Sequence, residues 1–117
     1  MKSIEIISIP VTDQQRSKKF YQDIGFKIVA EATFDKNQQW VQLGLPEGGP
    51  SITLVTWFKK MPAGSIQGLV IETENLEKEI ETLSSKGITV GKIDHLPWGK
   101  FAGLEDPDGN GLSLHQK

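Results

Sequence analysis

The side chains that could carry out proton transfer in this sequence are few. His115 ends a run that alternates as a strand does, and it shares the predicted inward face of that strand with Ser113. Glu72 lies on another predicted strand, and His95 lies in a loop before Trp98. An imidazole and a carboxylate are typical acid–base groups. A solvated histidine near the terminus and a carboxylate paired with lysine explain the same residues, so both interpretations stay open.

The composition argues against several other kinds of site. The 117 residues include no cysteine, which excludes disulfides, thiolate metal sites and cysteine nucleophiles. No serine or threonine stands in a nucleophile-elbow pattern, and the pair Gly48-Gly49 precedes no predicted helix, as a phosphate-binding loop would require. The formal net charge is −2 and the charges are interspersed, so we expect no nucleic-acid partner.

The length fits one domain, residues 1–117, with one sizeable core. No apolar run approaches the roughly 20 residues that a membrane span needs, so we expect no membrane partner. Glu5 interrupts the apolar N-terminus where a signal peptide needs a continuous apolar stretch. We therefore expect a soluble, cytoplasmic protein.

The chain shows the same order of predicted elements twice: a strand, a helix and three strands. Each helix follows a capping residue, Asp13 or Asn75, and ends at Gly25 or Gly87. A shift of 62 residues superposes both pairs, which indicates a duplication. We expect module 1 over about residues 1–58, a linker at 59–65 and module 2 over about 66–117. The predicted helices are residues 14–24 and 76–86, and the predicted strands are residues 3–11, 26–33, 39–44, 51–58, 67–72, 88–94, 100–105 and 111–115.

A turn with strong local chemistry joins the last two predicted strands. In Asp106-Pro107-Asp108-Gly109-Asn110, the proline fixes φ, the carboxylates accept from nearby backbone amides, and Gly109 and Asn110 tolerate positive φ. With the preceding Trp98-Gly99 pair, this run resembles the closing signature of the vicinal oxygen chelate superfamily. That superfamily includes glyoxalase I, bleomycin-resistance proteins, fosfomycin-resistance proteins and extradiol dioxygenases. The opening run from Ile9 to Phe26 is also similar to that of the superfamily.

The resemblance implies an α+β fold in which two tandem βαβββ modules form a curved eight-stranded sheet around a shared cleft. In metal-dependent members, the first and last strands of each module hold a divalent cation. The matching positions here are Ile6, Thr53, Gly68 and Ser113, which offer at most two neutral hydroxyls. We therefore expect no metal and no other cofactor, and neither glyoxalase I activity nor ordinary extradiol ring cleavage.

The residues predicted to face the cleft are aromatic with a few polar groups. Alternation places Val41, Leu43, Ile52 and Leu54 in the core, which turns their neighbours toward the cleft. The predicted ligand-binding residues are Trp40, Gln42, Thr53, Val55, Trp57, Phe101, Ser113 and His115, with Trp98 in a loop that could close over the cleft. Apolar walls with sparse polar groups are typical of small-molecule sites, although such rings can also fill a closed interior.

We predict metal-independent binding of a small apolar or aromatic molecule, as the resemblance to bleomycin-resistance proteins implies. We also expect a homodimer, the commonest oligomer, whose modules pair within one chain or across two. Two alternatives stay open. One is a glyoxalase-like enzyme that acts through Glu72 and His115 or a non-standard metal site, and the other is a dimeric protein-interaction module with a vestigial cleft.

Overall fold

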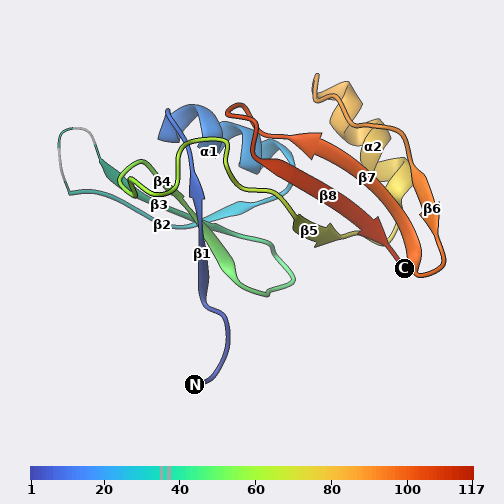
Figure 1. Cartoon of the computed structure of the whole chain (residues 1–117), viewed down its shortest axis with the longest axis horizontal. Coiled ribbons are helices and arrows are strands. Elements are labelled where there is room, and N and C mark those ends of the chain that lie inside the picture. Colours follow the sequence, from blue (N-terminus) through green and yellow to red (C-terminus); the bar gives the residue numbers. More distant parts are fainter. Residues whose placement is uncertain (35, 37) are drawn as a thin grey trace.

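The computed structural model describes residues 1–34, 36 and 38–117 and shows the order βαβββ twice (Figure 1). Module 1 contains β1 (Ile6–Pro10), α1 (Gln14–Asp23), β2 (Lys27–Thr33), β3 (Gln39–Gly44) and β4 (Ser51–Val55). Module 2 contains β5 (Leu69–Glu72), α2 (Leu76–Ser85), β6 (Asp94–Leu96), β7 (Gly99–Glu105) and β8 (Gly111–Gln116). Neither α1 nor α2 has the length and apolar composition to cross a membrane.

Each module forms its own four-stranded sheet, called here sheet A in module 1 and sheet B in module 2. The strand orders are β1-β4-β3-β2 and β5-β8-β7-β6. In both sheets the first strand runs parallel to the last, and the other pairs are antiparallel. The predicted α+β fold with two βαβββ modules is confirmed, and hydrogen bonds divide its eight strands into two sheets.

Both helices begin and end as the repeat predicts. The Asp13 carboxylate accepts from the backbone N–H groups of Gln15 and Arg16 and so caps α1, while the Asn75 side chain accepts from the Lys78 N–H and caps α2. Gly25 and Gly87 follow the two helices with φ of 118° and 80°, in the region that favours glycine. The local sequence alone therefore fixes the ends of both helices.

Helices α1 and α2 cover one face of their sheets. Helix α1 packs on β3 and β4, and α2 packs on β7 and β8. Val41, Leu43, Ile52 and Leu54 are at most 2% exposed and share one core with Tyr21 of α1, as alternation predicts. Because side chains alternate along a strand, the residues between them lie on the opposite, helix-free face of sheet A.

The predicted strand at residues 88–94 is wrong, because β6 begins only at Asp94. The N–H of Ile88 donates to a carbonyl of α2 at 3.0 Å, which ties the start of this segment to the helix end. Between that point and β6, the backbone bond to β7 in the described chain is from Gly91 to Gly103, at 2.8 Å. The edge of β7 that faces β6 is therefore paired over only part of its length.

The turn between β7 and β8 joins the two modules, as Figure 1 shows where it reaches α1. The Asp106 carboxylate is buried and accepts four hydrogen bonds. The N–H groups of Asp108 and Asn110 donate to Oδ1, each at 2.9 Å, and the Tyr21 hydroxyl and the Asn110 side-chain amide donate to Oδ2 at 2.9 Å and 2.8 Å. The Asn110 amide also donates to the carbonyl of Pro10 at 2.8 Å, at the end of β1. One buried carboxylate thus holds a turn of module 2 against α1 and β1.

A second carboxylate extends this junction toward solvent. The Asp108 carboxylate accepts from the Thr12 hydroxyl at 2.6 Å and pairs with the Arg16 guanidinium at 3.3 Å. Both partners lie at the start of α1, so the turn contacts the helix along one side. The prediction that the aspartates accept from nearby backbone amides is correct for Asp106. It is wrong for Asp108, whose carboxylate bonds Thr12 and Arg16 of module 1 instead. The sequence does not predict the partners of either aspartate in module 1, roughly 90 residues away.

The buried Tyr21–Asp106 pair predicts a loss of stability at high pH. Burial raises the pKa of Tyr21 above its ordinary value of about 10, and the charge of Asp106 and the hydrogen bond to it raise that pKa further. The neutral phenol therefore contributes stability that is fully present below about pH 10 and is lost as the pH rises toward the folded-state pKa. We expect the free energy of unfolding to fall by up to about 1.4 kcal/mol per pH unit above pH 10 from this group alone.

Urea unfolding at pH 9 and pH 11 measures this loss, and the Tyr21→Phe variant should lack that part of it. Tyr21 is the only tyrosine of the chain, so tyrosinate absorbance reports on this one group. Absorbance should rise only when the protein unfolds. Titration near pH 10 in the folded protein would contradict the burial of this phenol.

Candidate ligand-binding site

The predicted site residues of β3 and β4 lie on the face of sheet A away from α1. Gln42 lies opposite Thr53, and Thr53 lies opposite Ser8, so three strands bring polar groups together. The hydroxyls of Thr53 and Ser8 are 3.3 Å apart, and the Trp40 indole N–H donates to the Gln42 side-chain oxygen at 3.1 Å. Thr53 is 1% exposed, so it forms the base of this surface, whereas Trp40 and Gln42 are half-buried and open to a ligand.

Trp57 lies beyond sheet A, and the prediction that the strand continues to residue 58 is wrong. Strand β4 ends at Val55 because its partner β1 ends opposite, at Pro10. The Trp57 ring packs edge-on against Phe34, with centroids 5.4 Å apart, and lies tilted against Phe58 at 6.2 Å. Phe34 and Phe58 are 56% and 50% exposed, so these rings form an open aromatic surface. Neither ring is among the predicted ligand-binding residues, although Phe58 directly follows Trp57.

Val55 is buried, unlike these exposed rings. Its side chain is 1% exposed, yet it borders a cavity of about 380 Å³. That cavity lies between the ends of β1 and β4 and the predicted linker, with Phe58 and Met61 on its border. The cavity therefore connects the base of the sheet A surface to the segment between the modules.

The predicted site residues of module 2 lie on the face of sheet B away from α2. His115 stacks on its cross-strand partner Phe101, with ring centroids 4.2 Å apart and planes 10° apart. His115 Nε2 lies 3.2 Å from the carbonyl oxygen of Trp98, whose side chain is 65% exposed at the turn between β6 and β7. Glu72 lies opposite His115 on β5 and pairs with Lys117 at 3.5 Å. His115 and Glu72 are thus each engaged by another group, whereas His95, predicted in a loop, lies exposed in β6 opposite Lys100.

The structure brings together Trp40, Gln42 and Thr53 in module 1. In module 2 it brings together Phe101, His115 and the carbonyl of Trp98. Among the described residues, no hydrogen bond, ion pair or ring contact joins the predicted site residues of module 1 to those of module 2. The cavity beside Val55 is lined by none of the predicted site residues of module 2. Of the nine predicted ligand-binding residues, only Ser113 lines the larger cavity described next. One chain therefore presents two separate surfaces.

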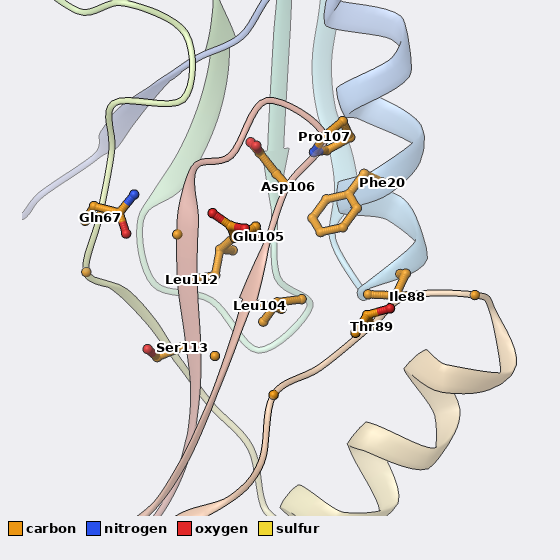
Figure 2. A pocket seen from close by; sticks show the side chains of 15 residues that line it. Phe20, Gln67, Ile88, Thr89, Leu104, Glu105, Asp106, Pro107, Leu112 and Ser113 are labelled. Carbon is orange, nitrogen blue, oxygen red and sulfur yellow. The ribbon is translucent and has the colours of Figure 1, made fainter.

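The larger cavity, of about 710 Å³, lies around β7 and β8 (Figure 2). In Figure 2, Gln67 and Ser113 lie on one side of these strands, and Phe20 and Ile88 lie on the other. Its lining includes five glycines and an exposed carboxylate, none of which is among the predicted ligand-binding residues, namely Gly68, Gly87, Gly91, Gly103, Gly111 and Glu105. Alternation along β7 was the available signal, since it places Gly103 and Glu105 on the same face as Phe101.

Residues 3–114 match the family model described as Glyoxalase/Bleomycin resistance protein/Dioxygenase superfamily. The chain belongs to this superfamily. The match covers nearly the whole chain, so it includes both βαβββ modules and confirms the resemblance seen in the opening and closing runs. No curated protein sequence matches the chain.

Solved structures of other members are similar over the full length. TnmS3, an antibiotic binding protein from Streptomyces sp. CB03234, is 33% identical with a TM-score of 0.92, over 99% of this chain and 96% of that one. A glyoxalase/bleomycin resistance protein from the same organism is 35% identical with a TM-score of 0.86, over 97% and 100%. A superfamily member from Sphaerobacter thermophilus DSM 20745 is 25% identical with a TM-score of 0.88, over 100% and 98%. The superfamily thus includes an antibiotic-binding relative of this chain.

The metal site of the metal-dependent superfamily members does not fit the residues of this chain. Thr53 lies opposite Ser8, and Ser113 lies opposite Val70, so the first and last strands bring together hydroxyls and an apolar side chain. The Thr53 hydroxyl already has a partner in Ser8. In the part of the chain that the structure describes, no three carboxylate or imidazole side chains come close enough to hold an ion. Neutral hydroxyls are weak ligands for a divalent cation, and we assign no metal chemistry to this set.

Proposed function

We propose that this protein binds small apolar or aromatic molecules without a metal. The observation that carries the proposal is the chemistry of the two helix-free sheet faces. They present Trp40 and the Phe101–His115 stack beside a few polar groups, with Trp57 just beyond the end of β4. Among the described residues they hold no set of metal ligands. Apolar walls with few fixed polar groups are the usual composition of a small-molecule site. The likeness to an antibiotic binding protein supports the same conclusion.

We further propose that the binding unit is a homodimer. The helix-free face of sheet B carries Val70, which is 51% exposed, and the turn between β6 and β7 carries Trp98, which is 65% exposed; a second copy would shield both from water. Two surfaces that stay separate within one chain can form one enclosed site when the sheet A face of one copy meets the sheet B face of another. Sedimentation of the purified protein measures this state, and a monomer at all concentrations would contradict the dimer.

Tryptophan fluorescence with bleomycin as the probe, in the presence of EDTA, tests the binding. We expect quenching by bleomycin in the wild type, and we expect Trp40→Ala and Phe101→Ala each to weaken binding by about tenfold or more, because a lost aromatic contact is worth about 1–2 kcal/mol. Ile4→Ala is the control, since Ile4 is 70% exposed and lies before β1. Circular dichroism should show the same fold in all variants.

Two results would contradict the proposal. Binding that appears only when a divalent cation is added would overturn its metal independence. Turnover of a bound compound that is abolished by His115→Ala or Glu72→Gln would show that the protein is an enzyme and not only a binding protein.

A further inference from the structure

The chain contains one asparagine that is followed by glycine, Asn110-Gly111 at the end of the turn between β7 and β8. In such a pair the backbone nitrogen of the glycine can attack the side-chain carbonyl carbon of the asparagine, because glycine has no side chain to hinder the approach. The new N–C bond closes a succinimide ring as the side-chain nitrogen leaves as ammonia. Water then opens the ring and leaves aspartate or isoaspartate in place of Asn110.

The backbone of Ile66 binds both reacting groups of this pair. The Ile66 N–H donates to the Asn110 side-chain oxygen at 3.0 Å, and the Gly111 N–H donates to the Ile66 carbonyl at 2.8 Å. The attacking group and the attacked group are therefore both held by the first residue after the predicted linker. The reaction needs a Gly111 nitrogen that is free to lose its proton and to turn toward the side chain, so it requires that Ile66 first move away.

The leaving group is bound as well. The Asn110 side-chain nitrogen donates to the Pro10 carbonyl and to Asp106 Oδ2, each at 2.8 Å, and the residue is 1% exposed. Both polar atoms of the side chain thus have partners, and water has little access to them. A site buried in this way reacts only from a locally opened state, and the population of that state sets the rate.

The product does not fit the place that Asn110 occupies. A carboxylate at position 110 has no N–H to donate, so it would place a negative charge against the Pro10 carbonyl and the Asp106 carboxylate. Isoaspartate would also lengthen the backbone by a methylene group directly before β8 and disturb the register of that strand. Both products therefore oppose reclosure of the junction between the modules.

We propose that Asn110-Gly111 is a conditional deamidation site. It is protected while Ile66 is in place, it reacts in copies whose linker has left the turn, and its product prevents the junction from closing again. The reaction consumes water and releases ammonia, so it needs no enzyme and no oxidant. Opened copies of the protein are thereby marked irreversibly, and this inference is independent of the proposed function.

Ageing of the full chain in mildly alkaline buffer, with and without enough guanidinium chloride to unfold it, tests the site. Trypsin cleaves after Lys100, and the peptide 101–117 contains no asparagine besides Asn110, so its change of mass, located by fragment ions, gives the rate. Isomerisation of the neighbouring Asp108-Gly109 pair leaves that mass unchanged. We expect the folded protein to react at least about a hundredfold more slowly than the unfolded chain.

Gly111→Ala tests the chemistry. The new methyl group hinders the attacking nitrogen, so this variant should react at least severalfold more slowly than the wild type when both are unfolded. We expect it to keep the fold, because Gly111 has no positive φ. The nearest atoms to an added Cβ all belong to the side chain of Gln67, which is exposed and free to move.

Two variants with the same backbone strain test the role of the linker. In Gly64→Ala the new Cβ collides with the Asp108 carbonyl and presses the linker away from the turn, whereas in Gly48→Ala it meets no atom within 4 Å. The two are compared at denaturant concentrations that unfold the same fraction of each. Under these conditions Gly64→Ala should deamidate at least about tenfold faster, and equal rates would refute protection by the linker.

Refolding tests the product. Wild type aged in guanidinium chloride should lose its recovery of native circular dichroism and of the unfolding midpoint in proportion to its deamidation, while Gly111→Ala aged alongside should recover. Equal rates in the folded and unfolded chain, no reaction at Asn110 in the unfolded chain, or deamidated protein that refolds to wild-type stability would each overturn the proposal.

Discussion

Replacing Asp106 by asparagine should destabilise the fold by about 3 kcal/mol, although the two side chains have the same shape. The new amide nitrogen would stand where Oδ2 now accepts from the Asn110 amide and the Tyr21 hydroxyl. Two donors would then face each other in a buried place, and two hydrogen bonds to a charged acceptor would be lost. Each such bond is worth about 1.5–3 kcal/mol, so even a partial rearrangement leaves a large deficit. Urea unfolding followed by circular dichroism measures the change.

Asp94→Asn makes the same chemical change at an exposed position and should alter stability by less than about 0.5 kcal/mol. A double-mutant cycle assigns the effect to the pair. Tyr21→Phe should destabilise the wild type more than it destabilises Asp106→Asn, because in the second case its acceptor is already gone. Additive effects, or a stability of Asp106→Asn equal to that of the wild type, would show that this carboxylate does not hold the junction.

The parts of the fold that follow from the sequence are those specified by neighbouring residues. Asp13 and Asn75 accept backbone hydrogen bonds only from the first turns of their own helices, and Gly25 and Gly87 end those helices through their own φ angles. Alternation along β3 and β4 identifies the buried face because the sheet rests on one helix. The duplication follows from the same local signals, repeated 62 residues apart.

The features that the sequence does not give depend on partners distant in the chain. Strand β4 ends at Val55 because β1 ends beside it, and no residue near Trp57 indicates this end of the strand. The segment before β6 leaves the sheet because α2 holds its first residue. The Tyr21 partner of Asp106 and the Thr12 and Arg16 partners of Asp108 lie in module 1, and the sequence of the turn does not indicate them.

The candidate site divides in the same way. Alternation places Trp40, Gln42 and Phe101 on the helix-free faces, which the structure bears out for their strands. The lining of the larger cavity depends on the register between segments, because Gly91 and Gly103 become neighbours only through their pairing. A single sequence marks each of these glycines as an ordinary strand or turn residue.

Gly64→Ala should destabilise the protein by about 3 kcal/mol or more, through the same junction but from the side of the linker. Gly64 has a φ of 83°, and its N–H donates to the carbonyl of Pro10 at 3.3 Å. An added Cβ would strain the backbone and collide with the carbonyl oxygen of Asp108. That oxygen belongs to a turn fixed by the Asp106 network, so it has little freedom to move. Thermal and urea unfolding measure the loss.

Gly48→Ala separates the strain from the collision. Gly48 has a φ of 101°, and an added Cβ there would meet no atom within 4 Å. Its variant should lose only about 1–2 kcal/mol, the backbone term that both substitutions share. The excess in Gly64→Ala then measures how firmly the linker is packed against the turn. Equal losses at the two positions would mean that the turn yields to the new methyl group, and that the modules are joined less rigidly than the Asp106 hydrogen bonds indicate.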